Sequence, residues 1–400
     1  MGIKFADRIN NLKSSEIREI LKLTEKPEMI SFAGGLPAPE LFPVEDIKKI
    51  SQMVLDEDGR SALQYTTTEG FTKLREQIAD RMNSKSKTNV TKDNILITNG
   101  SQQGLDFSGR VFLNEGDVVL CESPTYLGAI NAFKAYGPRF IEVPTDDSGM
   151  DMEELEKILK ETDKIKMIYV IPDFQNPTGR TWSLERRKAF IDIISRYEIP
   201  VIEDNPYGEL RFEGDYLPSL KSMDKKGLVI YLGSFSKIFC PGYRIGWTCA
   251  SDEILSKYIM VKQGADLQAS TIGQREVSKF MDTYDLDEHV KNIKSVYKRR
   301  RDLMLNTMKE EFPEGLKYNY PEGGLFTWVE LPKHLDAKEI MNDCIAENVA
   351  YVPGGSFYPN GGNENCFRLN YSNMPDERIV EGVKRLARVL ENHLQVEVNN

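Results

Sequence analysis

Short apolar runs alternate with amphipathic segments from about residue 94 to residue 250. Apolar runs of this length predict buried strands, and the segments between them have the spacing of surface helices. This alternation predicts an α/β fold with a mostly parallel, seven-stranded sheet and helices on both faces. The predicted strands are 95–97, 118–120, 140–143, 165–171, 201–202, 228–232 and 245–250.

Two of the predicted helices occupy residues 152–159 and 184–197. Ser183 precedes Leu-Glu-Arg and is therefore predicted to be the N-cap of the second helix, and Ser51 is a further N-cap candidate.

The pattern changes after about Val290, where a long charged helix is expected up to Glu311. Two short strands with a helix between them and a terminal helix follow, which together predict a smaller α/β domain. Near the N-terminus, a helical stretch precedes a Gly/Pro-rich loop that starts at Ile30. The predicted division is an N-terminal segment 1–45 that packs with the small domain, a large cofactor-binding domain 46–289 and a small C-terminal domain 290–400.

Composition and charge exclude several classes of protein. Of the 400 residues, 40% are hydrophobic and 28% are charged, as is usual for a soluble globular protein. The net charge is −10 with mixed signs, which argues against a nucleic-acid partner. No apolar stretch is long enough to cross a membrane, and the N-terminus lacks the apolar core of a signal peptide.

Cysteine and histidine usage narrows the chemistry. The five cysteines form no Cys-x-x-Cys pair, which favours reduced thiols in a cytoplasmic protein. Only three histidines are present, and none lies near a strand end, so neither a histidine-ligated metal nor a Ser-His-Asp triad is predicted. Acid–base chemistry would then fall to a lysine, a tyrosine or a carboxylate.

One lysine stands at the end of a predicted buried strand. Lys237 follows the apolar run 228–232 and is preceded by Ser234 and Ser236, with Arg244 after a Pro-Gly turn. Desolvation and neighbouring cations lower a lysine pKa, and a neutral amine forms a Schiff base with an aldehyde. The two serines and the arginine suit a phosphate, so the segment predicts pyridoxal 5′-phosphate (PLP) as cofactor. An exposed strand-end lysine is the alternative.

Polar residues follow the other predicted strands, and the carboxyl ends of such strands gather ligands. Ser101 and Gln102 open a helix and suit an anion, although they also suit an ordinary helix start. Asp204 would pair with a protonated pyridine nitrogen, with Tyr207 near the ring's phenolic oxygen; a helix-capping Asp is the alternative. Tyr126 could stack on a ring or lie in the core, and Asn176-Pro-x-Gly also fits a simple turn.

Taken together, these motifs resemble the class I/II aminotransferases of PLP fold type I, over nearly the whole chain. The combination of Asn176-Pro-x-Gly, Asp204-x-x-Tyr207, Ser-x-Ser-Lys237 and Arg244 with a late Arg368 carries the resemblance. The stretches 31–39, 231–237, 262–266 and 352–355 are similar to the 2-aminoadipate/kynurenine aminotransferase subgroup.

The resemblance implies a role for each matching residue. Lys237 would hold PLP as a Schiff base and move the substrate α-proton, Asp204 would keep the ring nitrogen protonated, and Tyr126 would stack on the ring. Asn176 and Tyr207 would bind the ring's 3′-oxygen. Tyr65 would reach the phosphate of a neighbouring subunit, which implies a homodimer. The implied phosphate ligands are Ser101, Gln102, Ser234 and Arg244, assisted by Ser236, and the implied substrate ligands are Arg368, Asn176 and Gly35.

The implied reaction is ping-pong transfer of an amino group from an L-amino acid to a 2-oxo acid such as 2-oxoglutarate. Arg18 in the N-terminal helix resembles a clamp for the distal carboxylate of 2-aminoadipate or glutamate, although it also fits an exposed helix arginine. Aromatic and branched-chain substrates stay open. Two other functions fit parts of the pattern: a PLP-dependent lyase, and a PLP-sensing domain of a transcription regulator. The regulator is disfavoured because such proteins carry a winged helix ahead of this domain, whereas this sequence starts almost at once with a segment that resembles the aminotransferase N-terminus.

Overall fold

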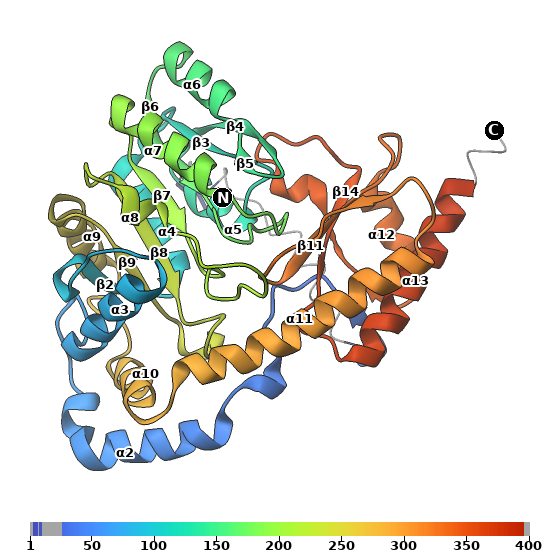
Figure 1. The fold of residues 1–400 in the computed structure, drawn as a ribbon. Helices are drawn as coiled ribbons and strands as arrows, with labels where there is room; N and C mark the ends of the chain where they lie inside the picture. Colours follow the sequence, from blue (N-terminus) through green and yellow to red (C-terminus); the bar gives the residue numbers. More distant parts are fainter. Residues whose placement is uncertain (1–2, 7, 10–25, 396–400) are drawn as a thin grey trace.

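A computed structural model describes residues 3–6, 8–9 and 26–395 of the chain. Figure 1 shows a larger α/β part, a smaller α/β part and a long helix, α11, that runs from one to the other. Among the described residues, no helix is both long and apolar enough to cross a membrane.

The larger part is built on one twisted sheet. In the described residues its strand order is β2-β9-β8-β7-β6-β3-β4-β5. Strands β8, β7, β6, β3 and β4 are mutually parallel, whereas β9 runs antiparallel to both of its neighbours. All seven predicted strands form, and a two-residue eighth strand, β5, extends the edge beyond the predicted seven. The bounds are β2 Ile95–Asn99, β3 Val118–Ser123, β4 Arg139–Asp146, β5 Gly149–Met150, β6 Ile165–Val170, β7 Val201–Asp204, β8 Val229–Ser234 and β9 Ile245–Cys249.

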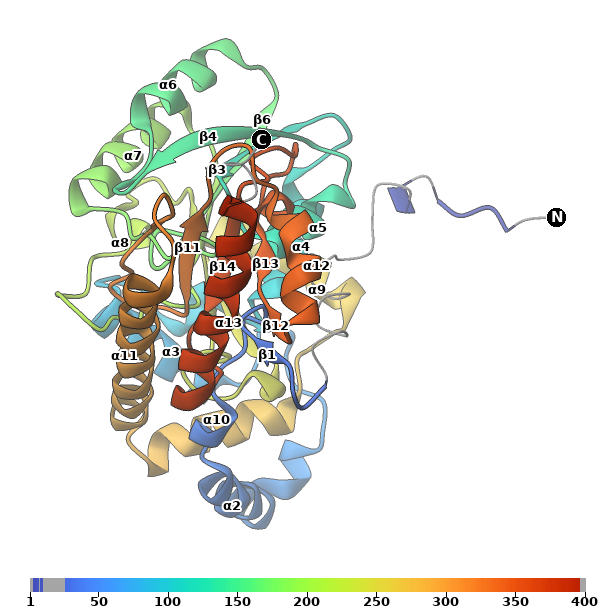
Figure 2. The ribbon, with the colours of Figure 1, turned by 90° about the vertical axis from the view of Figure 1, so that its right-hand side faces the viewer.

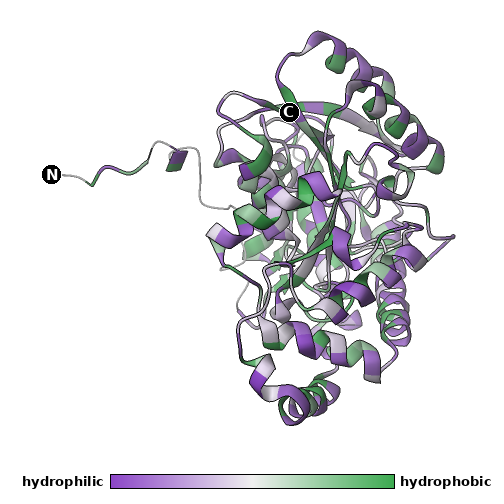
Figure 3. Ribbon diagram, turned by 90° about the vertical axis from the view of Figure 1, so that its left-hand side faces the viewer, coloured by the Kyte–Doolittle hydropathy of each residue, from purple (hydrophilic) through white to green (hydrophobic). Residues whose placement is uncertain are grey.

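Alternate strand residues face two hydrophobic layers, as the two-residue repeat of a strand requires. Ile202 and Tyr169 lie in a layer with α3, α4 and α9, whereas Val201 and Ile168 lie in a layer with α6 and α7. Figure 3 shows hydrophobic residues on the central strands and many hydrophilic ones on the outer helices. The helices of this part are α2 Val44–Ala62, α3 Thr72–Lys85, α4 Ser101–Phe112, α5 Leu127–Lys134, α6 Met152–Glu161, α7 Leu184–Tyr197, α8 Leu220–Met223, α9 Asp252–Ala265 and α10 Thr271–Thr283.

The smaller part carries a four-stranded antiparallel sheet of order β10-β11-β14-β13 in the described residues. β1, near the N-terminus, pairs in parallel with β12, and Phe32 lies in the hydrophobic cluster of this part. Helices α11 and α13 pack side by side (Figures 1 and 2). The bounds are β1 Ile30–Ser31, α11 Leu286–Glu311, β10 Lys317–Tyr318, β11 Phe326–Glu330, α12 Ala337–Ala346, β12 Val349–Ala350, β13 Val352–Pro353, β14 Cys366–Asn370 and α13 Asp376–Gln395.

Helix α11 contributes to both hydrophobic cores. Its residues Val290 and Ile293 belong to the core of the larger part, and its residues Met304 and Met308 belong to the core of the smaller part. The predicted division of the chain after residues 45 and 289 stays a prediction.

Helix caps test the two N-cap predictions. The Ser183 hydroxyl accepts a hydrogen bond from the backbone N–H of Arg186 at 3.1 Å, so the first prediction is confirmed. The Ser51 prediction is wrong, because α2 already begins at Val44 and Ser51 lies inside it. The sequence signal for the true start of α2 is the pair of acidic residues in its first turn, Glu45 and Asp46.

Candidate active site

A cavity of about 410 Å³ lies at the carboxyl edge of the large sheet. Its walls come from the segments after β2, β3, β6, β7 and β8, together with β14 of the smaller part. Arg244 reaches it because β9 is antiparallel, so the start of β9 lies at the edge where its neighbours end. Twelve predicted residues line the cavity: Gly35, Ser101, Gln102, Tyr126, Asn176, Asp204, Tyr207, Ser234, Ser236, Lys237, Arg244 and Arg368.

The amine of Lys237 faces this cavity from the turn after β8. Its Nζ donates to the carbonyl oxygen of Gly35 at 2.8 Å. Burial, followed by the nearby cations Arg368 and Arg244, lowers the pKa of Lys237 to about 8. No carboxylate pairs with it among the described residues, so the neutral, nucleophilic form of the amine is more accessible near neutral pH than in an ordinary lysine.

Asp204 is the last residue of β7 and is 2% exposed. Its Oδ2 accepts a hydrogen bond from the Tyr169 phenol at 2.9 Å, whereas its Oδ1 has no partner in the described part of the chain. Burial raises the pKa of Asp204 to about 7. An unpaired buried carboxylate oxygen requires a donor, and the N–H of a protonated pyridine ring is such a donor. The site therefore fits PLP.

The alternative role for Asp204, a carboxylate that caps a helix, is taken by its neighbour Glu203. Glu203 points to the opposite layer of the sheet, where its carboxylate accepts hydrogen bonds of 2.8 Å from the backbone N–H groups of Leu220 and Lys221. Within the described part of the chain, Asp204 makes no such contact with a helix.

Arg368 on β14 is buried at the other side of the cavity and is 3% exposed. Its guanidinium donates to Asn176 Oδ1 and to the carbonyl oxygen of Ala33, both at 2.6 Å. Asn176 Nδ2 in turn lies 3.5 Å from the Tyr207 hydroxyl. A guanidinium fork of this kind suits a carboxylate, and Asn176 joins it to the Tyr207 phenol, which lines the same cavity.

The end of the cavity that was predicted to hold a phosphate lies at the start of α4. Gly100 precedes it with φ of +69°, and a Cβ there would lie 2.4 Å from Arg244 Nη2, so only glycine allows this approach. Arg244 Nη1 lies 3.4 Å from the Ser236 hydroxyl, and the Ser234 hydroxyl accepts from the Ser236 backbone N–H at 3.1 Å. Helix N–H groups, hydroxyls and one arginine together make an anion site.

Two predicted residues are not among these twelve. Arg18 lies outside the described residues. Tyr65, in the loop after α2, is 78% exposed and does not line the cavity of its own chain.

Tyr169 is a site residue that the sequence argument missed. It lies inside the apolar run that predicted β6, and its phenol bonds Asp204. The register places Tyr169 opposite Ile202 on the adjacent parallel strand, so Tyr169 and Asp204 share one face. A tyrosine at a buried position of this mostly apolar strand was the available signal.

A parallel sheet that presents a lysine, an unpaired aspartate and an anion site at its carboxyl edge defines a PLP-dependent enzyme. The family model "Aminotransferase class I and II" matches residues 28–386, so the chain belongs to this family. It is therefore a PLP-dependent transaminase of fold type I.

Similar proteins agree with this assignment. The chain is 45% identical to aromatic-amino-acid aminotransferase 1 of Thermococcus litoralis, over 98% of this chain and 95% of the relative. It is 43% identical to a 2-aminoadipate transaminase of Thermus thermophilus, over 98% and 97%. A solved structure of a Pyrococcus horikoshii kynurenine aminotransferase, in complex with PMP, matches with a TM-score of 0.94 and 44% identity, over 98% of this chain and 97% of that one.

Proposed function

We propose that the protein transfers the amino group of an L-amino acid to a 2-oxo acid such as 2-oxoglutarate by a ping-pong mechanism. The donors we propose are 2-aminoadipate and glutamate, with aromatic and branched-chain amino acids as further candidates. The observation that carries the proposal is the single cavity that holds Lys237, Asp204 and Arg368. The names of the relatives support the donor classes, because they include 2-aminoadipate and aromatic amino acids.

Each residue then has a task set by its geometry. Arg368 and Asn176 would bind the α-carboxylate, since their polar atoms already form one hydrogen-bonded unit. Gly35 would border the substrate, as its carbonyl oxygen accepts a hydrogen bond from the Lys237 amine in the cofactor-free protein. When bound, PLP supplies an electron sink that stabilises negative charge at the substrate α-carbon.

Lys237 would take the α-proton on Nζ and return it on the cofactor side, because its pKa near 8 lets the amine act in both directions close to neutral pH. Asp204 Oδ1 would hold the ring N–H, and Tyr207 with Asn176 would hold the ring's 3′-oxygen. Tyr126 would cover the ring face. Ser101, Gln102, Ser234, Ser236 and Arg244 would hold the phosphate.

The exposed Tyr65 supports a homodimer with shared sites. The backbone N–H of Thr66 donates to the side chain of Gln268, which places the Tyr65 loop beside the turn that carries Leu267. Tyr65 and Leu267 are both large apolar side chains that are more than half exposed in the single chain. A second copy would cover them and would receive Tyr65 at its phosphate end.

The direct test is the absorbance of the purified protein during titration with L-2-aminoadipate. We expect the absorbance band of the lysine-bound cofactor to decrease as 2-aminoadipate transfers its amino group to the enzyme. Addition of 2-oxoglutarate, which accepts that amino group, should restore the band. Steady release of ammonia without an acceptor would instead indicate a lyase. A band that ignores 2-aminoadipate but responds to phenylalanine or leucine would move the donor class to aromatic or branched amino acids.

A further inference from the structure

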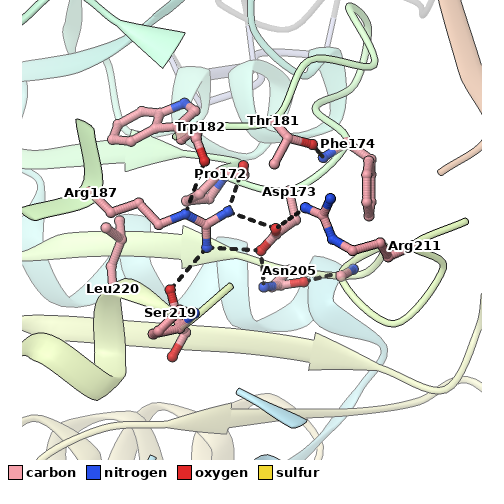
Figure 4. Close-up of polar contacts among 12 residues, drawn as sticks. Pro172, Asp173, Phe174, Thr181, Trp182, Arg187, Asn205, Arg211, Ser219 and Leu220 are labelled. Carbon is pink, nitrogen blue, oxygen red and sulfur yellow. Dashed lines mark hydrogen bonds and ion pairs between the residues drawn. The ribbon is translucent and has the colours of Figure 1, made fainter. Parts of the chain in front are cut away.

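A buried ion-pair network lies beneath the segment that carries Asn176. Asp173, which is 5% exposed, stands between two arginines that approach it from opposite sides (Figure 4). Arg187 of α7, which is 0% exposed, pairs with Asp173 at 2.6 Å, and Arg211, which is 5% exposed, lies 3.8 Å from it. None of the three lines the cavity.

Arg187 holds both ends of the segment 172–182. Its guanidinium donates to the carbonyl oxygens of Pro172 at 3.1 Å and Trp182 at 3.2 Å (Figure 4). It also donates to the carbonyl oxygen of Pro218 at 3.1 Å. Arg187 therefore reinforces a direct backbone hydrogen bond of 2.8 Å, from the Trp182 N–H to the Pro172 carbonyl oxygen, that closes the loop at whose middle Asn176 stands.

The Asp173 carboxylate also contacts the segment that carries Asp204 and Tyr207. Asn205 Nδ2 donates to Asp173 Oδ2 at 3.0 Å, and Asn205 Oδ1 accepts from the backbone N–H of Gly208 at 2.9 Å. The turn that presents Tyr207 is thus tied to the loop that presents Asn176, through a carboxylate outside the cavity.

Phe174 shows that this loop is held in an unfavourable conformation. It is fully buried and has φ of +48°, in the left-handed region that bulky residues avoid. The Arg211 guanidinium lies 4.8 Å from the centre of its ring, and a Cβ on Gly324 would lie 2.5 Å from its Cβ. A strained residue two positions before Asn176 persists only if its surroundings hold it.

We propose that Arg187, Asp173 and Arg211 are positioning residues, which set Asn176 and Tyr207 at the distances needed to bind the substrate carboxylate and the cofactor ring. The inference rests on the proposed roles of Asn176 and Tyr207. It adds residues that touch neither ligand and act only through the loops they hold.

The variants Arg187→Lys and Arg187→Met/Asp173→Leu separate positioning from stability. Lysine keeps the charge but loses the fork that spans Pro172 and Trp182. The apolar double variant removes the Arg187–Asp173 ion pair, and Arg211 keeps its ion pair with Glu322 at 2.9 Å, so no buried charge is left without a partner. Such replacements are often neutral for stability. Arg186→Lys is the matched control, because this neighbour on α7 also binds a carboxylate and backbone carbonyls, namely those of Asp146, Gly149 and Met150.

In the holoenzyme we expect kcat/KM to fall by roughly tenfold to a hundredfold in both variants, mainly through KM, as displaced binding groups cause. The pH midpoint of the bound cofactor's visible absorbance should move in the same direction as in Asn176→Ala. In a crystal structure of the double variant without cofactor, Asn176 Oδ1 should lie beyond hydrogen-bonding distance of Arg368. Arg186→Lys should match the parent protein in all three readouts.

An unchanged absorbance midpoint in both variants would overturn the inference, even if the melting temperature fell, because the network would then be only structural. Failure of the proposed function looks different. If the proposed function is wrong, Asn176→Ala itself will leave the pH midpoint of the cofactor absorbance and KM unchanged. The distance between Asn176 Oδ1 and Arg368 in the double variant will still test the network.

Discussion

The unpaired carboxylate of Asp204 leads to a prediction about the protein without its cofactor. Asp204→Asn replaces a carboxylate by a neutral group of the same shape. Burial raises the pKa of Asp204 from its ordinary value of 3.8 to about 7 in the folded protein. The folded state therefore binds more protons than the unfolded state between about pH 4 and pH 7, and its stability falls as the pH rises through this window.

The size of the effect follows from the two pKa values. A change from 3.8 to about 7 costs about 4 kcal/mol above pH 7, since each unit is worth about 1.4 kcal/mol. Asparagine does not ionise and escapes this cost. With an unfolding entropy of about 2.1 cal/mol/K per residue, 4 kcal/mol corresponds to roughly 5 °C in a chain of 400 residues.

The assay is differential scanning calorimetry of the cofactor-free protein and its variant at pH 5 and pH 8. Asp204→Asn should melt about 5 °C higher than the parent at pH 8, and the gap should shrink at pH 5. Saturation with PLP should reverse the order at pH 8, because only the carboxylate gains a charged partner. Equal melting temperatures at pH 8 without cofactor would refute the reasoning.

Glu203→Gln provides the control for that experiment. Burial also raises the pKa of Glu203 to about 7, but both of its oxygens accept backbone hydrogen bonds. The amide of glutamine would turn an NH₂ group towards one of those N–H donors, which offsets the ionisation cost that the variant escapes, so Glu203→Gln should gain less than Asp204→Asn at pH 8. Its response to PLP should equal that of the parent, because Glu203 faces away from the cavity.

Three further predictions concern the lysine, the dimer and the donor. Lys237→Ala should keep PLP affinity and lose turnover, measured by cofactor titration and by the full reaction with 2-oxoglutarate; near-normal turnover would remove Lys237 from the chemistry. Mixing Lys237→Ala subunits with Tyr65→Ala subunits should restore activity absent from either alone, because each mixed dimer then holds one intact site; no recovery after exchange of subunits argues against a shared site. Arg18→Ala should raise KM for glutamate and 2-aminoadipate more than for leucine or phenylalanine, and equal changes across these donors would place Arg18 outside the pocket.

Much of the site follows from the sequence because strand ends converge. Once seven strands are recognised, Lys237, Asp204 and Ser101 must lie near one another at the carboxyl edge of the sheet. The position of Arg244 depends in addition on the reversed direction of β9, which the apolar pattern of that strand does not reveal. Tyr169 needs the register between β6 and β7, because a shift of one residue would turn it to the opposite layer.

The network around Asp173 lies beyond what local patterns predict. Arg187 belongs to α7, and its side chain alone resembles an ordinary helix arginine. Only the packing of α7 over the segment 172–182 brings it to Asp173, and only a residue without a side chain at Gly324 leaves room for Phe174. Contacts of this kind join distant parts of the chain, so propensity and spacing carry no information about them.

The two kinds of buried charge in this protein have opposite consequences. Asp173 and Arg187 are paired and hydrogen-bonded, so their ionised forms are satisfied before any ligand binds and can hold loops in a strained arrangement. Asp204 and Lys237 have no oppositely charged partner among the described residues, and burial moves their pKa values to about 7 and about 8, towards each other. Their charges are left for the cofactor and substrate to satisfy. Binding energy from the ligands is therefore used at the unpaired groups, whereas the paired groups keep the distances at which those contacts form.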